Sequence, residues 1–127
     1  MGPSLGITLL HVEHTPTEYG GAFALIGRER LQAVFVSSDR ANFANGQLIA
    51  NFARHESLPD AYSYRESVEA GGLLSYGANL PDLYARAAGY VDKILTGTSP
   101  ADLPVQQPSK FELVINLKRE VKLILRP

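Results

Sequence analysis

The chain has 127 residues, 45% of them hydrophobic and 20% charged, and a formal net charge of −1 at pH 7. This length and balance are typical of one globular domain with its own core, and the weak charge gives no electrostatic argument for binding nucleic acid. The absence of cysteine excludes disulfides and thiolate metal sites, and no apolar run approaches the roughly 20 residues of a membrane-spanning helix.

The first residues lack the basic start and apolar stretch of a signal peptide, so we expect cytoplasmic residence if the chain is expressed as given. Residues 7–12 are apolar and β-branched, which predicts a strand. Residues 15–18, Thr-Pro-Thr-Glu, have the pattern of a capping box and predict a helix that ends near residue 30.

A second strand and helix are predicted before residue 60. Residues 33–36 form a continuous apolar run, typical of a strand buried on both faces of a parallel sheet. A helix follows over about 41–55. Its expected buried stripe consists of Ala44, Leu48, Ile49, Phe52 and Ala53.

The second half continues the alternation. A strand ending at residues 62–65 precedes a short helix over 66–70, which Gly71 and Gly72 can end, and a strand over 73–76. Asn79 is predicted to cap a helix that Gly97 ends. That helix is expected to carry an apolar stripe of Leu83, Ala87, Val91, Ile94 and Leu95.

Residues 97–110 contain three prolines and read as an extended connector, and residues 111–117 alternate as a strand does. The element order predicts an α/β fold with three α/β/α layers and a mainly parallel sheet. We expect an α/β lobe over residues 1–97, and a connector with a C-terminal strand and tail over 98–127.

Polar side chains follow three of the predicted strands, at the edge where α/β folds bind ligands. An aspartate there suits a ligand ammonium, hydroxyls or amides suit a carboxylate, and tyrosine rings suit the apolar part of a ligand. The alternative is that the serines and aspartate only cap helices and that Arg65 pairs with Glu69. The predicted ligand-binding residues are Ser38, Asp39, Tyr64, Arg65, Ser75, Tyr76 and Asn79.

No enzyme motif is present, and we expect neither catalysis nor a cofactor. His11 and Glu13 would share one strand face while His14 would not, which favours surface histidines over a metal site. Asp39 at a strand end also suggests a response-regulator phosphoacceptor, but only Glu13 stands where an acidic magnesium pair is needed.

Several motifs in the second half of the chain are specific when they are taken together. They include Tyr64-Arg65-Glu66, Val68-Glu-Ala-Gly-Gly-Leu73, Ser75-Tyr76-Gly77, Tyr90-Val-Asp-Lys-Ile-Leu95 and Lys110-Phe-Glu-Leu-Val-Ile-Asn-Leu-Lys118. These motifs resemble the C-terminal part of ABC-transporter substrate-binding proteins with the type I periplasmic-binding fold. The resemblance covers most of residues 20–118 and less than half of a family protein.

This resemblance implies a periplasmic, non-enzymatic domain that binds a small polar solute such as an amino acid or carboxylate, with an ABC permease as partner. It also implies a truncated protein, because the family has a preceding lobe and a central first strand that are missing here, and because residues 117–127 depart from its pattern. Half of a two-lobed site should bind its solute weakly. The alternative is a stand-alone α/β interaction or signalling module without a small ligand.

We also expect a homodimer. A missing central strand leaves unpaired sheet edges, and the connector 97–110 is long enough to carry the strand 111–117 to a partner chain. Each chain would then lend its C-terminal segment, or a bare strand edge, to the other. The alternative is a monomer whose C-terminal strand folds back onto its own sheet.

Overall fold

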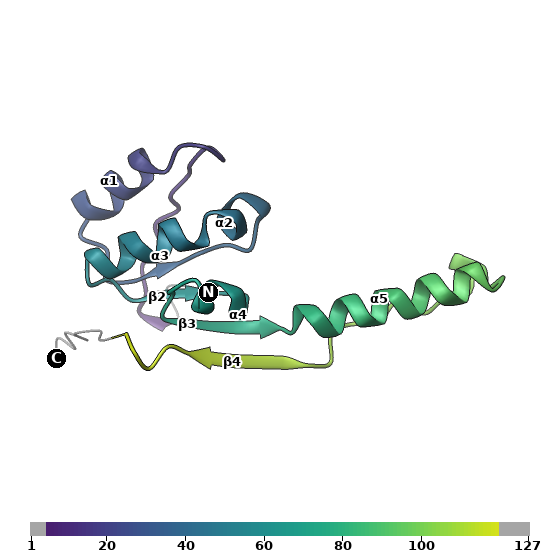
Figure 1. Ribbon diagram of the computed structural model, residues 1–127. Helices are drawn as coiled ribbons and strands as arrows, with labels where there is room; N and C mark the ends of the chain where they lie inside the picture. The colour runs from purple at the N-terminus through teal and green to yellow at the C-terminus, as the bar shows by residue number, and fades with distance from the viewer. Residues whose placement is uncertain (1–4, 120–127) are drawn as a thin grey trace. The chain divides into compact units, whose positions relative to one another are not determined.

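The computed structural model describes residues 5–119 (Figure 1). The chain divides into two compact units, Met1–Gln32 and Ala33–Pro127, which are described separately. This boundary differs from the one predicted at residues 97–98, and that division stays a prediction. Most of the segment 117–127, where we expected a departure from the family pattern, lies outside the described residues.

The N-terminal unit contains one helix, α1 (Gly20–Arg28), among its described residues. The predicted capping box is wrong, because Thr15 lies in a turn in which its carbonyl accepts from the Glu18 N–H at 3.2 Å. The helix therefore begins later, with Tyr19 at the N-cap position. The Glu18 carboxylate accepts from the Gly21 N–H at 3.2 Å and so satisfies one free donor of the first turn.

The predicted strand at residues 7–12 is also wrong. These residues form no regular element in the structure, and Ile7 and Leu9 are 52% and 78% exposed. A strand requires a neighbouring strand to receive its backbone hydrogen bonds. Within the described part of the chain, the sheet contains only the four strands of the C-terminal unit. Although its β-branched composition favours a strand, this segment therefore has no neighbouring strand with which to form backbone hydrogen bonds.

The C-terminal unit is built on that sheet. Its strands are β1 (Val34–Phe35), β2 (Asp60–Tyr62), β3 (Leu74–Ala78) and β4 (Phe111–Ile115), in the order β1-β2-β3-β4. The pairs β1–β2 and β2–β3 are parallel, and β4 runs antiparallel to β3. The predicted α/β fold with a mainly parallel sheet is confirmed.

The register separates two faces of this sheet. Tyr62 is opposite Ser75, and Ser75 is opposite Val114, so these three side chains share one face. The short helix α4 (Arg65–Glu69) contacts β2, β3 and β4 on this face. Ser75 is consequently 1% exposed.

The predicted helix over 41–55 is two helices, α2 (Arg40–Ala44) and α3 (Gly46–His55). The break at Asn45 resets the buried stripe, which follows the i, i+3, i+4, i+7 pattern at Gly46, Ile49, Ala50 and Ala53. The predictions for Ile49 and Ala53 are confirmed, and Phe52 is half-buried. Those for Ala44 and Leu48 are wrong, because Ala44 is exposed at the end of α2 and Leu48 is exposed on α3 outside the reset stripe.

The prediction that residues 33–36 are buried on both faces is wrong as well. Val36 is 8% exposed, but Phe35 is 71% exposed. β1 is the edge strand of the sheet, and Phe35 belongs to the face opposite α4. An apolar run alone does not distinguish an edge strand from a central one.

The long helix α5 (Leu80–Leu95) begins and ends as predicted. The Asn79 side chain accepts from the Asp82 N–H at 2.9 Å, and Gly97 follows the helix with φ +106°. No residue of α5 is buried, and the predicted stripe residues Val91, Ile94 and Leu95 are 56%, 41% and 81% exposed.

The predicted connector is confirmed and contains a 3₁₀ turn, Pro100–Asp102. It returns along α5 to β4 (Figure 1), and the Tyr90 hydroxyl donates to the Pro104 carbonyl. Lys110 lies 2.6 Å from Asp82. This hydrogen bond and the positive charges of Lys110 and Arg86 hold the pKa of the Asp82 carboxyl below its usual value.

A buried polar cluster joins the chain beyond β4 to the start of β2. Asp60 accepts from the Tyr62 hydroxyl at 2.6 Å and from the Leu73 N–H at 3.2 Å, and Arg119 donates to the same carboxylate. Arg119 also donates to the Leu58 carbonyl at 3.0 Å. The side chains of Asp60 and Arg119 are 0% and 4% exposed, so their charges are compensated inside the protein.

None of the helices described is both long and apolar enough to cross a membrane.

Candidate ligand-binding site

The carboxyl ends of β1, β2 and β3 lie at one edge of the sheet because the three strands are parallel. A pocket lies at this edge between the loops that follow β1 and β2. It is lined by Val36, Ser37, Ser38, Asn42, Phe43, Tyr62, Ser63, Tyr64 and Ser67. Four serine hydroxyls, the Asn42 amide, the exposed ring of Phe43 and the half-buried ring of Tyr64 therefore meet where α/β folds bind ligands.

Asp39 organises the β1 side of this pocket. One carboxylate oxygen caps α2 by accepting from the Asn42 N–H at 2.9 Å. The other accepts from the Ser37 hydroxyl at 2.9 Å and from the Asn42 side-chain amide at 2.6 Å. The helix-capping alternative for Asp39 is thus confirmed, and this network holds Ser37 and Asn42 in the pocket wall.

Tyr64 supplies the β2 side. It is the extended residue before α4, and its ring meets the Phe43 ring edge to face, with centroids 6.1 Å apart and an interplanar angle of 77°. Such a pair is a firm apolar wall, because edge-to-face packing fixes both rings. Ser63 and Ser67 stand beside this wall.

Gly77 fixes the loop after β2 against β3. A Cβ atom at this position would lie 2.0 Å from the Ser63 carbonyl oxygen, closer than any side chain permits. Glycine at residue 77 therefore lets the backbone of Ser63 approach the sheet and reach the pocket.

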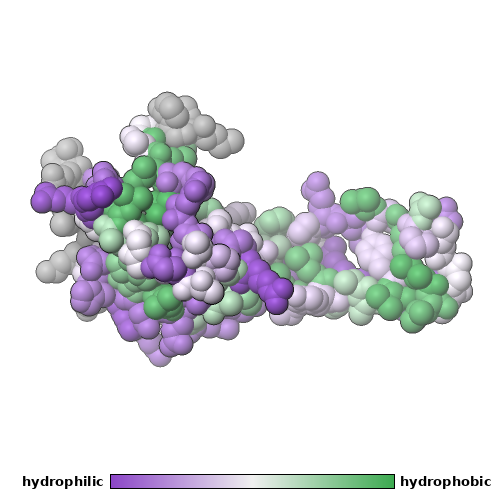
Figure 2. Space-filling view, turned by 90° about the horizontal axis from the view of Figure 1, so that it is seen from above, coloured by the Kyte–Doolittle hydropathy of each residue, from purple (hydrophilic) through white to green (hydrophobic). Residues whose placement is uncertain are grey.

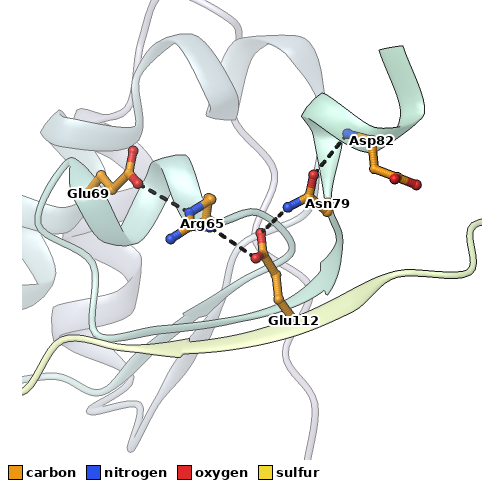
Figure 3. A network of polar contacts seen from close by, with 5 residues as sticks. All are labelled: Arg65, Glu69, Asn79, Asp82 and Glu112. Atoms are coloured by element: carbon orange, nitrogen blue, oxygen red, sulfur yellow. Dashed lines mark hydrogen bonds and ion pairs between the residues drawn. The ribbon is translucent and has the colours of Figure 1, made fainter. Parts of the chain in front are cut away.

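Arg65 and Asn79 belong to a neighbouring polar network (Figure 3). Arg65 donates to Glu69 at 3.2 Å and to Glu112 at 3.1 Å. Asn79 donates to the other oxygen of Glu112 at 3.3 Å while it caps α5. The predicted Arg65–Glu69 pair is confirmed. The Arg65 guanidinium thus connects α4 to β4. Its positive charge is already balanced by these two carboxylates.

The remaining two predicted residues are placed elsewhere. Ser75 lies inside the covered face of the sheet, and its hydroxyl has no hydrogen-bond partner among the described residues. Tyr76 is 65% exposed on the opposite face, where its ring stacks on Phe111 at 6.2 Å. Strand alternation sends neighbouring residues to opposite faces, so Ser75 and Tyr76 do not join the pocket together.

Sequence reasoning missed several lining residues. Asn42 follows the cap Asp39 by three residues, a spacing that could have indicated its backbone contact with the cap. Phe43 and Ser67 lie on short helices, where no periodic signal marks the side that faces a pocket. Glu112 is 47 residues from Arg65, and nothing local indicates that contact.

In the portion of the chain that is described, no group of three or more His, Cys, Asp or Glu side chains is arranged to hold a metal ion.

A family model described as ABC transporter substrate binding protein matches residues 26–125. The chain belongs to this family. The matched segment contains the whole pocket and all four strands, so family membership and site geometry concern the same part of the molecule. Among curated proteins, none matches the chain.

Solved structures share the fold of this family member. A conserved domain protein from Vibrio cholerae O1 biovar El Tor is 24% identical, with a TM-score of 0.82 over 93% of this chain and 40% of its own. An ABC domain in complex with L-Trp from Streptococcus pneumonia is also 24% identical, with a TM-score of 0.80 over 91% of this chain and 40% of its own.

A ligand-free, open substrate-binding protein with adhesive properties from Clostridium difficile is 19% identical, with a TM-score of 0.61 over 92% of this chain. The chain spans 40% of the length of each of these three structures. The predicted likeness to one lobe of a periplasmic binding protein is confirmed at the level of fold.

Proposed function

We propose that this chain forms one side of a non-catalytic solute-binding site in an ABC-transporter substrate-binding protein. The solute is small and polar, of the amino-acid or small-carboxylate class, and an ABC permease in the membrane receives it from the periplasm. The observation that carries this proposal is the pocket at the strand ends, which combines serine hydroxyls, the Asn42 amide and an aromatic wall.

Each part of that pocket suits one part of such a solute. The hydroxyls of Ser38, Ser63 and Ser67 can donate to a carboxylate. The edge-to-face pair of Phe43 and Tyr64 offers apolar area to a side chain. A neighbour of the same fold is described in complex with L-Trp, which is a ligand of this class.

The size of the pocket argues for weak binding by this chain alone. Its cavity volume is about 10 Å³, which is roughly the room needed by one water molecule. Ligand sites normally enclose most of a ligand, with volumes of roughly 300–1,000 Å³. We therefore infer that a solute rests on this surface and stays exposed to water unless a second surface closes over it.

The test is a two-dimensional NMR titration of the chain with L-Trp, L-Leu, L-Ala and benzoate. We expect a dissociation constant near 1 mM for the best of these, about −4 kcal/mol. The backbone amides of Ser38, Ser63 and Ser67 should shift. Tyr64→Ala should weaken binding by roughly two- to thirteenfold, because an aromatic contact contributes about 0.5–1.5 kcal/mol.

Tyr84→Ala is the matched control, since Tyr84 is 73% exposed on α5, away from the lining residues. Submicromolar binding by the monomer would contradict the open-surface argument. Equal weakening by both variants, or no shift at the three serine amides, would reject this pocket as the site. A chain that binds none of the four compounds would favour the alternative, an interaction or signalling module.

A further inference from the structure

Tyr62 connects the pocket at the strand ends with the buried polar cluster. It is the last residue of β2 and lines the pocket, together with Ser63 and Tyr64, which follow it. Its hydroxyl donates at 2.6 Å to Asp60, the first residue of β2, so its side chain reaches back toward the start of the strand. Tyr62 is 3% exposed. One buried side chain therefore joins the two ends of this strand.

The Tyr62 ring is also confined from the side. A Cβ atom at Gly72 would lie 2.5 Å from the Tyr62 ring and 2.8 Å from the Ser67 carbonyl oxygen, so glycine lets the chain before β3 pack directly against both. The Gly72 N–H donates to that carbonyl at 2.9 Å, and Ser67 lines the pocket as well. With its hydroxyl bonded and its ring packed, Tyr62 has one defined position.

The acceptor of the Tyr62 hydroxyl depends on Arg119. The Asp60 side chain is 0% exposed, and a buried carboxylate without a cation is strongly unfavourable. Among the described residues, Arg119 is the cation that pairs with it, while the Leu73 N–H adds a neutral donor at 3.2 Å. Without Arg119 the carboxylate should draw in water or turn outward, and the Tyr62 hydroxyl would lose its fixed acceptor.

Arg119 is itself fixed by the turn that follows β4. Its N–H donates to the Asn116 carbonyl at 3.1 Å, and its guanidinium donates to the Leu58 carbonyl at 3.0 Å. The Asn116 N–H donates to the Leu73 carbonyl at 2.8 Å, and its side-chain amide donates to the Gly72 carbonyl at 3.3 Å. This turn is thus bonded to the chain before β2 and before β3, which holds the guanidinium at Asp60.

We propose that Arg119 is a positioning residue for the pocket: it holds Asp60 in place, Asp60 holds Tyr62, and Tyr62 fixes the β2 side of the pocket. This inference rests on the proposed function. Arg119 does not line the pocket, so it acts without touching the solute. A binding surface that is already ordered avoids the cost of ordering on binding, and loss of this order lowers the affinity.

The experiment is the NMR titration with L-Trp, L-Leu, L-Ala and benzoate, repeated on variants. Arg119→Met should raise the dissociation constant of the best compound roughly two- to thirteenfold, the usual cost of ordering one side chain on binding. The amides of Ser63 and Tyr64 should also change position in the spectrum before any compound is added. A folded Arg119→Met with the affinity of the parent overturns the proposal.

Two double variants without the buried charges separate the hydrogen bond from the ion pair. Asp60→Asn/Arg119→Met keeps an oxygen that can accept from the Tyr62 hydroxyl, whereas Asp60→Ala/Arg119→Met removes it. The first should bind more tightly than the second. Equal affinities would overturn the part of the proposal that runs through Tyr62. If Arg119→Met fails to fold, this pair decides the question, because neither double variant buries an unpaired charge.

Ile49→Ala is the control for a general loss of stability. Ile49 is 5% exposed on α3 and does not line the pocket, so this variant should be less stable but bind as the parent does. If it weakens binding as much as Arg119→Met, the effect of Arg119 is on stability alone and the proposal is wrong. A parent chain that binds none of the four compounds rejects the proposed function, and this inference with it, before any substitution is made.

Discussion

The helices α3 and α5 have the same kind of sequence and opposite surroundings. Both carry an apolar stripe, but α3 buries Ile49, Ala50 and Ala53 whereas the longer α5 buries no residue. In Figure 2, the apolar surface in the right-hand part belongs to α5 and its connector. A helical period therefore identifies the apolar side of a helix, but the packing of the rest of the protein decides whether that side is covered.

This difference separates the C-terminal unit into a packed part, made by the sheet with α3 and α4, and an unpacked part, made by α5 with its connector. The same substitution should change the free energy of unfolding strongly in the packed part, and weakly or in the opposite direction in the unpacked part. Equilibrium denaturation by urea measures both, since the midpoint changes with the free energy of unfolding.

The largest contrast is expected between two glycines. Gly77→Ala should cost at least about 4 kcal/mol of stability, because the new Cβ meets the backbone oxygen of Ser63, which no rotamer change can move. Gly89→Ala in α5 should instead stabilise by about 0.5–1 kcal/mol, because no atom lies within 4 Å of the added Cβ and alanine favours a helix. Equal effects at the two positions would contradict the separation into packed and unpacked parts.

Two isoleucines make the next contrast. Ile49→Ala should cost about 3 kcal/mol, since Ile49 is 5% exposed and its removal leaves a cavity. Ile94→Ala should cost less than about 0.5 kcal/mol, since Ile94 is 41% exposed on α5. A loss at Ile94 comparable to that at Ile49 would mean that the α5 stripe is covered in solution.

Alkaline pH should act on the packed part through Tyr62. Burial, followed by the hydrogen bond to Asp60 and the charge of that carboxylate, raises the pKa of the Tyr62 hydroxyl far above its usual value near 10. Above pH 10 the unfolded chain loses this proton first, so stability is intact below pH 10 and falls by up to about 1.4 kcal/mol per pH unit above it.

Denaturation midpoints between pH 8 and 11 test this, with Tyr62→Phe as the comparison. The variant should be less stable at pH 8, because Asp60 loses a donor, but its stability should fall less steeply above pH 10. Parallel curves for parent and variant would exclude Tyr62 as the titrating group.

The smallest effect is expected at the cap of α5. Asn79→Ala removes the acceptor for the Asp82 N–H and also the weaker donor to Glu112 at 3.3 Å, and the lost cap should cost about 1 kcal/mol of helix stability. Because α5 is unpacked, the loss should appear as faster amide hydrogen exchange within α5, with little change in the sheet. Faster exchange throughout β2 and β3 would show that α5 and the sheet unfold as one.

The sequence was informative wherever the deciding signal is local. The cap at Asn79, the stop at Gly97, and the end of α4 and start of β3 around Gly71 and Gly72 all depend on residues a few positions apart. The pocket was predicted in part for the same reason, since Ser38 and Tyr64 each lie within three residues of the end of a strand.

The errors have non-local causes. Phe35 was taken for a core residue because the sequence does not reveal that β1 is an edge strand, and residues 7–12 have strand composition without a partner strand. Ser75 and Tyr76 were assigned to one site because they are neighbours in the sequence. Successive side chains of a strand, however, lie on opposite faces of the sheet. Arg65 is compensated by Glu112, which only the return of β4 brings near.

The contact between Asp60 and Arg119 has a consequence for synthesis of the protein. The two residues are 59 positions apart, so at ordinary translation rates roughly 3 to 12 s pass between their additions to the nascent chain. Until Arg119 has been added, the Asp60 carboxylate has no cation with which to pair, so its burial in the protein interior is unfavourable. The sheet should therefore close only after residue 119 has left the ribosome, and a ribosome that stalls before this point should release a chain that quality-control proteases remove.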